Sequence, residues 1–225
     1  MKVFNTLSEK PWIGSSTGTG FEHIVEDNYT PGKTALKFFL TVVSMLFFLF
    51  IITFLSRTQF ADFQALAGEP WLPLENSNQL LINTGLILLA SILLQISVQF
   101  RTKVSANVKF TLITVAMTTS LLFIFGQWQV WQLLNSNGYY VNSNPANSFF
   151  YLLTGMHALH LLGGLFAVFR LIYIFYRNNN SKKFDQALQL ATTYWHYLLI
   201  LWIALFGLLT SSTETFKTIA QICGF

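Results

Sequence analysis

The stretch FFYLLTGMHALHLLGGL, residues 149–165, decides the fold because no charged residue interrupts it. A helix needs about 20 mostly apolar residues to cross the hydrocarbon layer of a membrane, which is about 30 Å thick. The apolar run continues on both sides, so a span is predicted over about residues 148–176. His157 and His160 lie inside it, and the pair can be read as metal or haem ligands, as part of a proton relay, or as helix packing.

Four further stretches of the chain are long and apolar enough to cross a membrane. They lie at about residues 35–56, 79–100, 110–134 and 188–211. Charged residues make up 10% of the sequence, against about 25% in an ordinary soluble domain. The strands of a membrane β-barrel are shorter and alternate between apolar and polar residues, whereas these runs are continuous. The predicted fold class is therefore all-α, a polytopic bundle of five transmembrane helices over residues 34–225, preceded by a soluble cytoplasmic tail, residues 1–33.

The distribution of lysine and arginine predicts how the helices cross the membrane, because connections rich in these residues stay on the cytoplasmic side. The basic residues concentrate in the tail and in the connections that join the second span to the third and the fourth span to the fifth. They are Lys2, Lys10, Lys33, Lys37, Arg101, Lys103, Lys109, Arg177, Lys182 and Lys183. The connection at residues 135–147 carries no charge. We therefore predict that the N-terminus is inside and the C-terminus outside.

A ligand role for the histidines is disfavoured because the spans offer few other ligands. His23 lies in the predicted tail, so His157, His160 and His196 are the histidines within spans, and no Asp or Glu lies inside any predicted span. A metal site needs further ligands, and a proton path through a membrane is usually marked by acids. The same shortage disfavours a small transporter or a b-type cytochrome. No catalytic, cofactor-binding or metal-binding residue is assigned.

Three glycines beside the histidine pair favour helix packing instead. Small residues let membrane helices approach closely, and in such a contact the imidazoles are expected to hydrogen-bond to a neighbouring helix. The fifth span opens with TTYWHYLLILW, which supplies the rest of this helix-packing motif. The predicted motif comprises Gly155, His157, His160, Gly163, Gly164, Tyr194, Trp195 and His196.

The fourth and fifth spans also predict a lipid site. If they form an antiparallel hairpin that turns near Lys182, Arg170 and His196 lie at similar depth in the inner half of the membrane. Arg170, Tyr173 and Arg177 share one helix face, because residues three and four apart are neighbours. A basic face near the inner surface suits an anionic phospholipid head group. The alternative is that Arg170 extends to the interface without a bound lipid.

Four segments of the chain resemble subunit III of the haem–copper terminal oxidases. TGMHALHLLGG resembles the family's T-G-x-H-x-x-H-x-x-x-G stretch, and YWHYLLILW resembles its Y-W-H-F-x-x-x-x-W element about 35 residues further on. FIFGQWQVWQLL resembles its G-Q-x-x-x-W/Y-x-x-L segment, and WLPLENSNQLLINTGLILLAS resembles the approach to another span. The resemblance covers about residues 33–211, and the five spans match the short form of this subunit.

The resemblance implies a subunit without a redox centre of its own. Haem and copper are then expected in partner subunits, and the chain is expected to pack beside oxidase subunits I and II in a bacterial inner membrane. The complex would reduce O2 to water and pump protons, while this chain would hold structural phospholipid in a helix cleft and stabilise the catalytic subunit. The electron donor, cytochrome c or a quinol, and any larger respiratory supercomplex stay open, and no nucleic-acid partner is expected.

The chain departs from the family pattern at two positions. Met45 stands where the family often has an acid in the first span of this form, and Leu199 stands where an acid usually follows the Tyr-Trp-His motif. Both departures favour a structural and lipid-holding role over proton handling. The closest alternative is a subunit III-like accessory protein of a nitric oxide reductase.

Overall fold

The described part of the chain is built from five long α-helices, each long and apolar enough to cross a membrane. The computed structural model describes residues 31–63, 78–100, 106–178, 181–212, 214–216, 218 and 221. The helices are α2 (Pro31–Arg57), α3 (Asn78–Gln99), α4 (Ala106–Ser136), α5 (Pro145–Asn178) and α6 (Ser181–Leu209). This confirms the predicted all-α membrane fold. Residues 1–30 of the predicted tail lie outside the described residues.

The helices begin and end where local backbone chemistry dictates. Pro145 opens α5, where a missing N–H costs nothing, and the side-chain oxygen of Asn144 accepts a bond from the N–H of Ala146 (3.2 Å), as an N-cap does. Beyond the end of α4, Gly138 has a φ of 85°. The N–H of Tyr139 donates to the carbonyl of Leu134 (2.9 Å), which is the bond that closes a glycine-terminated helix end.

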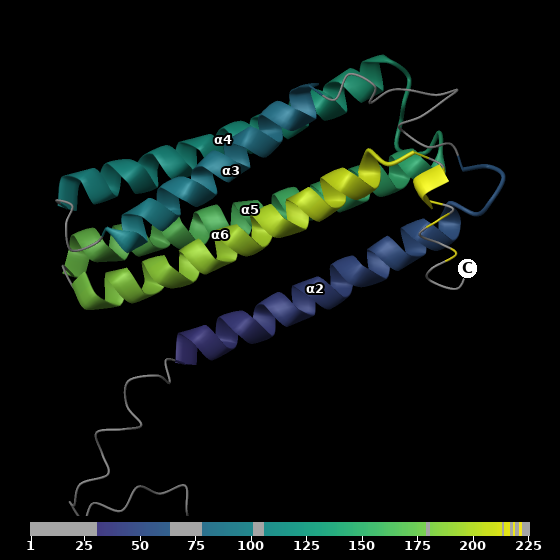
Figure 1. Ribbon diagram of the computed structural model, residues 1–225. Coiled ribbons are helices and arrows are strands. Elements are labelled where there is room, and N and C mark those ends of the chain that lie inside the picture. Colours follow the sequence, from purple (N-terminus) through teal and green to yellow (C-terminus); the bar gives the residue numbers. More distant parts are fainter. Residues whose placement is uncertain are drawn as a thin grey trace, which may run out of the picture.

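Four of the helices form a bundle, and the fifth lies beside it. The α3–α4 contact is the most extensive, and α5 and α6 pack on each other and on this pair. We call α3, α4, α5 and α6 the four-helix bundle. Figure 1 shows α2 running along the side of the bundle formed by α5 and α6, and α2 contacts these two helices alone among the described elements.

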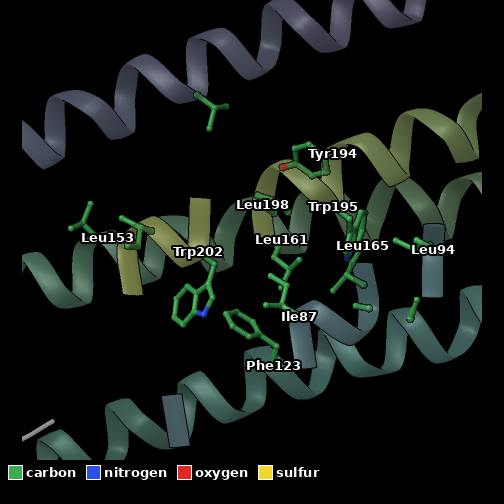
Figure 2. Packing of buried hydrophobic residues seen from close by; sticks show 14 of the residues in the cluster. Ile87, Leu94, Phe123, Leu153, Leu161, Leu165, Tyr194, Trp195, Leu198 and Trp202 are labelled. Carbon is green, nitrogen blue, oxygen red and sulfur yellow. The ribbon is translucent and has the colours of Figure 1, made fainter. Parts of the chain in front are cut away.

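The core of the molecule lies inside the four-helix bundle. Large side chains fill it with less than 2% of their surface exposed, and Figure 2 shows Phe123 of α4 against Trp202 of α6. The largest of the fully buried side chains are Trp195, Trp202, Phe47, Phe54, Phe123, Phe150, Ile87, Leu94, Ile113, Leu153, Leu161 and Leu188. Two of these, Phe47 and Phe54, come from α2. The remaining ten belong to the bundle.

An ion pair joins the first turns of α4 and α6. The Nζ of Lys109 lies 2.9 Å from Oδ1 of Asp185, and both side chains are partly buried. At the opposite end of the bundle, Nε2 of Gln79 at the start of α3 donates to Oε1 of Gln129 near the end of α4 (2.9 Å). These contacts fix an up-and-down arrangement in which neighbouring helices in the chain run antiparallel. Which end faces the cytoplasm stays a prediction from the charge distribution.

Candidate functional site: a groove between α2 and the bundle

A groove of about 710 Å³ opens between α2, α5 and α6. Its walls are almost wholly apolar, and one basic side chain, Arg170, stands among the lining residues. The lining residues are Ala35, Leu36, Phe39, Leu159, His160, Gly163, Gly164, Ala167, Val168, Arg170, Ala187, Leu190, Ala191, Tyr194 and Trp195. Small residues of α5 and α6, such as Gly163, Ala167 and Ala187, line the groove and leave space between the bundle and α2.

Two adjacent glycines of α5 have different roles at this groove. A Cβ atom on Gly164 would lie 2.7 Å from Cε1 of Tyr194 and 3.0 Å from the ring of Trp195, so α6 lies directly against this glycine. A Cβ on Gly163 would meet nothing within 4 Å, which leaves this position open toward the groove. Gly155 lies about two helical turns earlier in α5, and a Cβ on it would lie 3.9 Å from the ring of Trp131.

Arg170 is an exposed cation without an ion pair among the described residues. The ion pairs of the described chain are Arg57–Asp62 and Lys109–Asp185, and neither includes Arg170. Tyr173, on the same face of α5, is 60% exposed. Arg177 belongs to α5, and its side chain lies outside the described residues. Arg170 therefore presents a positive charge at the groove that no carboxylate of the described chain neutralises.

His196 does not share the groove with Arg170, although the two were predicted to lie at similar depth. Because α5 ends at Asn178 and α6 begins at Ser181, Arg170 is about two helical turns from the connection and His196 about four. His196 faces α3 instead. Its Nδ1 lies 2.5 Å from Oγ of Ser91, and its Nε2–H donates to Oε1 of Gln95 (3.0 Å).

The histidine pair makes none of the interhelical hydrogen bonds that were expected. The Nδ1–H of His160 donates to the carbonyl of Met156 in its own helix (2.7 Å), and its ring lies 5.6 Å from that of Phe47 of α2. His157 is fully buried, and neither ring nitrogen has a partner among the described residues. The interhelical bond at this motif comes from the backbone, because the hydroxyl of Tyr194 donates to the carbonyl of His160 (2.9 Å).

Three tryptophans link the helices of the bundle in one repeated way, which sequence reasoning missed. Each indole N–H donates to a hydroxyl on a neighbouring helix, and that hydroxyl donates to the carbonyl four residues before it. Trp131 donates to Thr154 (3.1 Å), whose hydroxyl donates to the carbonyl of Phe150 (2.6 Å). Trp195 donates to Ser120 (3.0 Å), whose hydroxyl donates to the carbonyl of Ala116 (2.8 Å). Trp202 donates to Thr84 (2.9 Å), whose hydroxyl donates to the carbonyl of Leu80 (2.8 Å). Polar side chains satisfied in this way hold membrane helices together. The sequence signal is a tryptophan and a hydroxyl residue at matching depth in two different spans.

Comparison with known proteins assigns the chain to a family. The family model of cytochrome c oxidase subunit III matches residues 22–210. The chain belongs to the cytochrome c oxidase subunit III family. This membership confirms the resemblance that the histidine and Tyr-Trp-His motifs indicated, and these motifs lie in α5 and α6 at the groove and the α5–α6 contact.

Individual relatives carry the same description. A probable cytochrome c oxidase subunit 3 from Mycobacterium bovis is 38% identical over 96 residues, which are 41% of this chain and 45% of that protein. Cytochrome c oxidase subunit 3 from Thermostichus vulcanus is 29% identical over 178 residues, 75% of this chain and 85% of the relative. The chain thus spans about half the length of the mycobacterial relative that it matches.

The two positions that depart from the family pattern lie on different kinds of surface. Met45 is 63% exposed on α2, whereas Leu199 is partly buried against the hydrophobic core.

Across the part of the chain that the structure describes, no group of three or more His, Cys, Asp or Glu residues is placed to hold a metal ion. The arrangement at the groove therefore offers apolar walls, one cation and backbone contacts, which is the chemistry of amphiphile binding.

Proposed function

We propose that this chain is the non-redox subunit III of a bacterial respiratory haem–copper oxidase, which packs on subunit I, binds phospholipid in the groove and stabilises the catalytic subunit. The single observation that carries the proposal is the family match, because the matched residues 22–210 include all five helices completely. The reduction of O2 and the pumping of protons are then activities of the complex, with haem and copper in its other subunits.

The outer surface of the chain supports a place among other membrane subunits. Large apolar side chains stand exposed along α2, α4 and α5, with exposed fractions above 50% at many positions. On α5 these residues recur at intervals of three and four, namely Leu159, Leu162, Phe166, Phe169 and Tyr173. A helix stripe with this spacing suits contact with another helix as well as with lipid chains.

The groove supports the phospholipid part of the proposal. Its volume of about 710 Å³ and apolar walls suit acyl chains, and Arg170 supplies a positive charge for a phosphate group. An anionic head group beside a basic residue near the inner surface gains roughly 1 kcal/mol for each such residue. Lys33 and Lys37, in the first turns of α2, line a smaller neighbouring pocket and add charge at the same end. His196, which bonds to α3, is no part of the proposed lipid site.

The proposed placement in the membrane follows from charge and from the relatives. Of the described basic residues, Lys33, Lys37, Lys109 and Arg170 lie toward the end of the bundle where α2, α4 and α6 begin, and Arg57 lies at the other end of α2. Lysine and arginine accumulate on the cytoplasmic side of membrane proteins, so this end is assigned to the cytoplasm. Relatives from Mycobacterium bovis and Thermostichus vulcanus support a bacterial inner membrane.

The experiment that tests the proposal is identification of what the chain binds in its own membrane. The chain is tagged, solubilised in a mild detergent and purified, and the co-purifying proteins are identified by mass spectrometry alongside a visible spectrum. We expect a large haem-bearing subunit and oxygen consumption by the purified complex. A complex without haem contradicts the proposal.

The same preparation separates the proposal from its nearest alternative. An accessory subunit of a nitric oxide reductase would bring a haem-bearing partner that consumes nitric oxide instead of oxygen. A haem spectrum from the chain alone, after its partners are stripped, would contradict a non-redox role.

A further inference from the structure

In two fully buried side chains of the bundle, every polar side-chain atom lacks a partner among the described residues. Both amide atoms of Gln127 in α4 and both ring nitrogens of His157 in α5 lack a hydrogen-bond partner among the described residues. Gln127 is 1% exposed and His157 is 0% exposed. A buried polar atom without a partner costs free energy, and nearly all such atoms in proteins are satisfied by protein or by ordered water.

The two side chains occupy facing positions of α4 and α5. The indole of Trp131 bonds to Thr154 (3.1 Å), and the ring of Phe123 lies 5.7 Å from that of His157. Gln127 is four residues from both Phe123 and Trp131, so all three share one face of α4. On α5, Thr154 and His157 are three residues apart and share a face in the same way. Gln127 therefore lies opposite the turn of α5 that carries His157.

A third side chain belongs to this layer of the bundle. A Cβ atom on Gly126, the residue beside Gln127, would lie 2.2 Å from Oδ1 of Asn83 in α3, which shows how closely this amide approaches α4. The Nδ2 of Asn83 also lacks a partner among the described residues, and the side chain is 1% exposed. We call Asn83, Gln127 and His157 the polar layer.

The polar layer contrasts with the tryptophan links of the bundle. The indole N–H groups of Trp131, Trp195 and Trp202 are all satisfied by hydroxyl groups. A direct bond between Gln127 and His157 would pair one atom of each and leave the others unsatisfied. A water molecule offers two donors and two acceptors, and buried waters typically make about three bonds to otherwise unsatisfied groups.

We propose that Gln127 and His157 bind an ordered water molecule between α4 and α5, with Asn83 available as a further partner. The ligand is water and not an ion, because the amides of Asn83 and Gln127 carry no charge and the described polar layer contains no carboxylate. With Asn83 as its third partner, the water joins the side chains of three helices, α3, α4 and α5. Each tryptophan link joins only two helices. This inference depends on the side chains of the bundle and holds whichever complex retains the chain.

The test is a cryo-electron microscopy map of the purified complex at a resolution that shows ordered water. We expect a separate density peak within hydrogen-bond distance of an amide atom of Gln127 and a ring nitrogen of His157. A direct contact between the two side chains, or apolar packing without a peak, overturns the proposal.

Variants give a second, independent readout. Gln127→Leu should abolish the peak and lower the temperature at which the complex loses this chain, because His157 is left unpaired. Adding His157→Phe to that variant should recover part of the loss, since no buried polar atom then needs the water. Gln132→Leu, on the exposed face of α4, is the matched control and should change neither readout. A peak that persists in Gln127→Leu contradicts the assignment.

Discussion

The contacts that hold the four-helix bundle together differ from the contacts that hold α2 to the bundle. Inside the bundle, each of three indole N–H groups bonds across a helix boundary to a hydroxyl, and glycine lets α5 touch α6 directly. α2 buries only Val43, Phe47, Phe54 and Leu55, and its hydroxyl at Ser44 meets Tyr197 of α6 (3.0 Å). The difference explains why a groove forms beside α2 and not within the bundle.

The same difference separates the part of the fold that packs tightly from the part that borders the groove. Without a hydrophobic drive between helices in lipid, association depends on close packing and on interhelical hydrogen bonds. The bundle is rich in both. α2 has few of either at its first half, where Ala35 and Phe39 face the groove, so a lipid can serve as packing material between α2 and the bundle.

The largest effect is expected from removing a tryptophan link of the bundle. Trp195→Ala deletes a side chain that is 1% exposed and its bond to Ser120. Truncating a buried tryptophan costs about 3–5 kcal/mol, so the complex should lose this chain at a clearly lower temperature in a thermal-shift assay. Trp128→Ala, at a position 56% exposed, is the matched control. Equal losses from both variants would show that burial in the bundle does not govern stability.

A smaller effect is expected from adding one methyl group between α5 and α6. Gly164→Ala places a Cβ 2.7 Å from Tyr194, and overpacking of a well-packed contact costs about 1–3 kcal/mol. Gly163→Ala adds the same methyl group next door, where nothing lies within 4 Å. Chain retention on heating should fall for Gly164→Ala and stay near that of the unaltered protein for Gly163→Ala. The reverse order would contradict the assignment of the two glycines.

The smallest effect on stability is expected at the bond between α2 and α6. The hydroxyl of Ser44 donates to the carbonyl of Leu40 (2.8 Å), so Tyr197 is the donor to Ser44. Interhelical side-chain bonds of this kind average about 0.6 kcal/mol in a membrane protein. Tyr197→Phe should therefore shift unfolding slightly, and Tyr173→Phe, at an exposed position of α5, should not shift it. A loss as large as that of Trp195→Ala would mean that α2 is no looser than the bundle.

The sequence predicts the helices of this protein well because their signal is local. Five apolar runs with few charged residues, each long enough to cross a membrane, define α2 to α6, and the structure extends most of them by a few residues beyond the predicted limits. The glycines beside the histidine pair predict a close helix contact, and the structure places one of them, Gly164, against Tyr194 and Trp195. Such features depend on the order of residues along one helix.

The contacts of individual side chains are harder to predict because they depend on how the helices are rotated and shifted against each other. His196 was grouped with Arg170 from an assumed turn near Lys182, yet α6 begins at Ser181 and turns His196 toward Ser91. The imidazole of His160 bonds within its own helix. A shift of a few residues in one connection is enough to move a side chain to another face.

The central claim is that the groove beside α2 holds an anionic phospholipid through Arg170. Native mass spectrometry of the gently solubilised complex counts the bound phospholipids in the unaltered protein, in Arg170→Leu and in Arg57→Leu. The last of these removes an arginine that is paired with Asp62, away from the residues that line the groove, and is the matched control. We predict that Arg170→Leu loses acidic phospholipid while Arg57→Leu retains it. Full retention of acidic phospholipid by Arg170→Leu would contradict the claim. It would favour the alternative in which Arg170 extends to the membrane interface without a bound lipid.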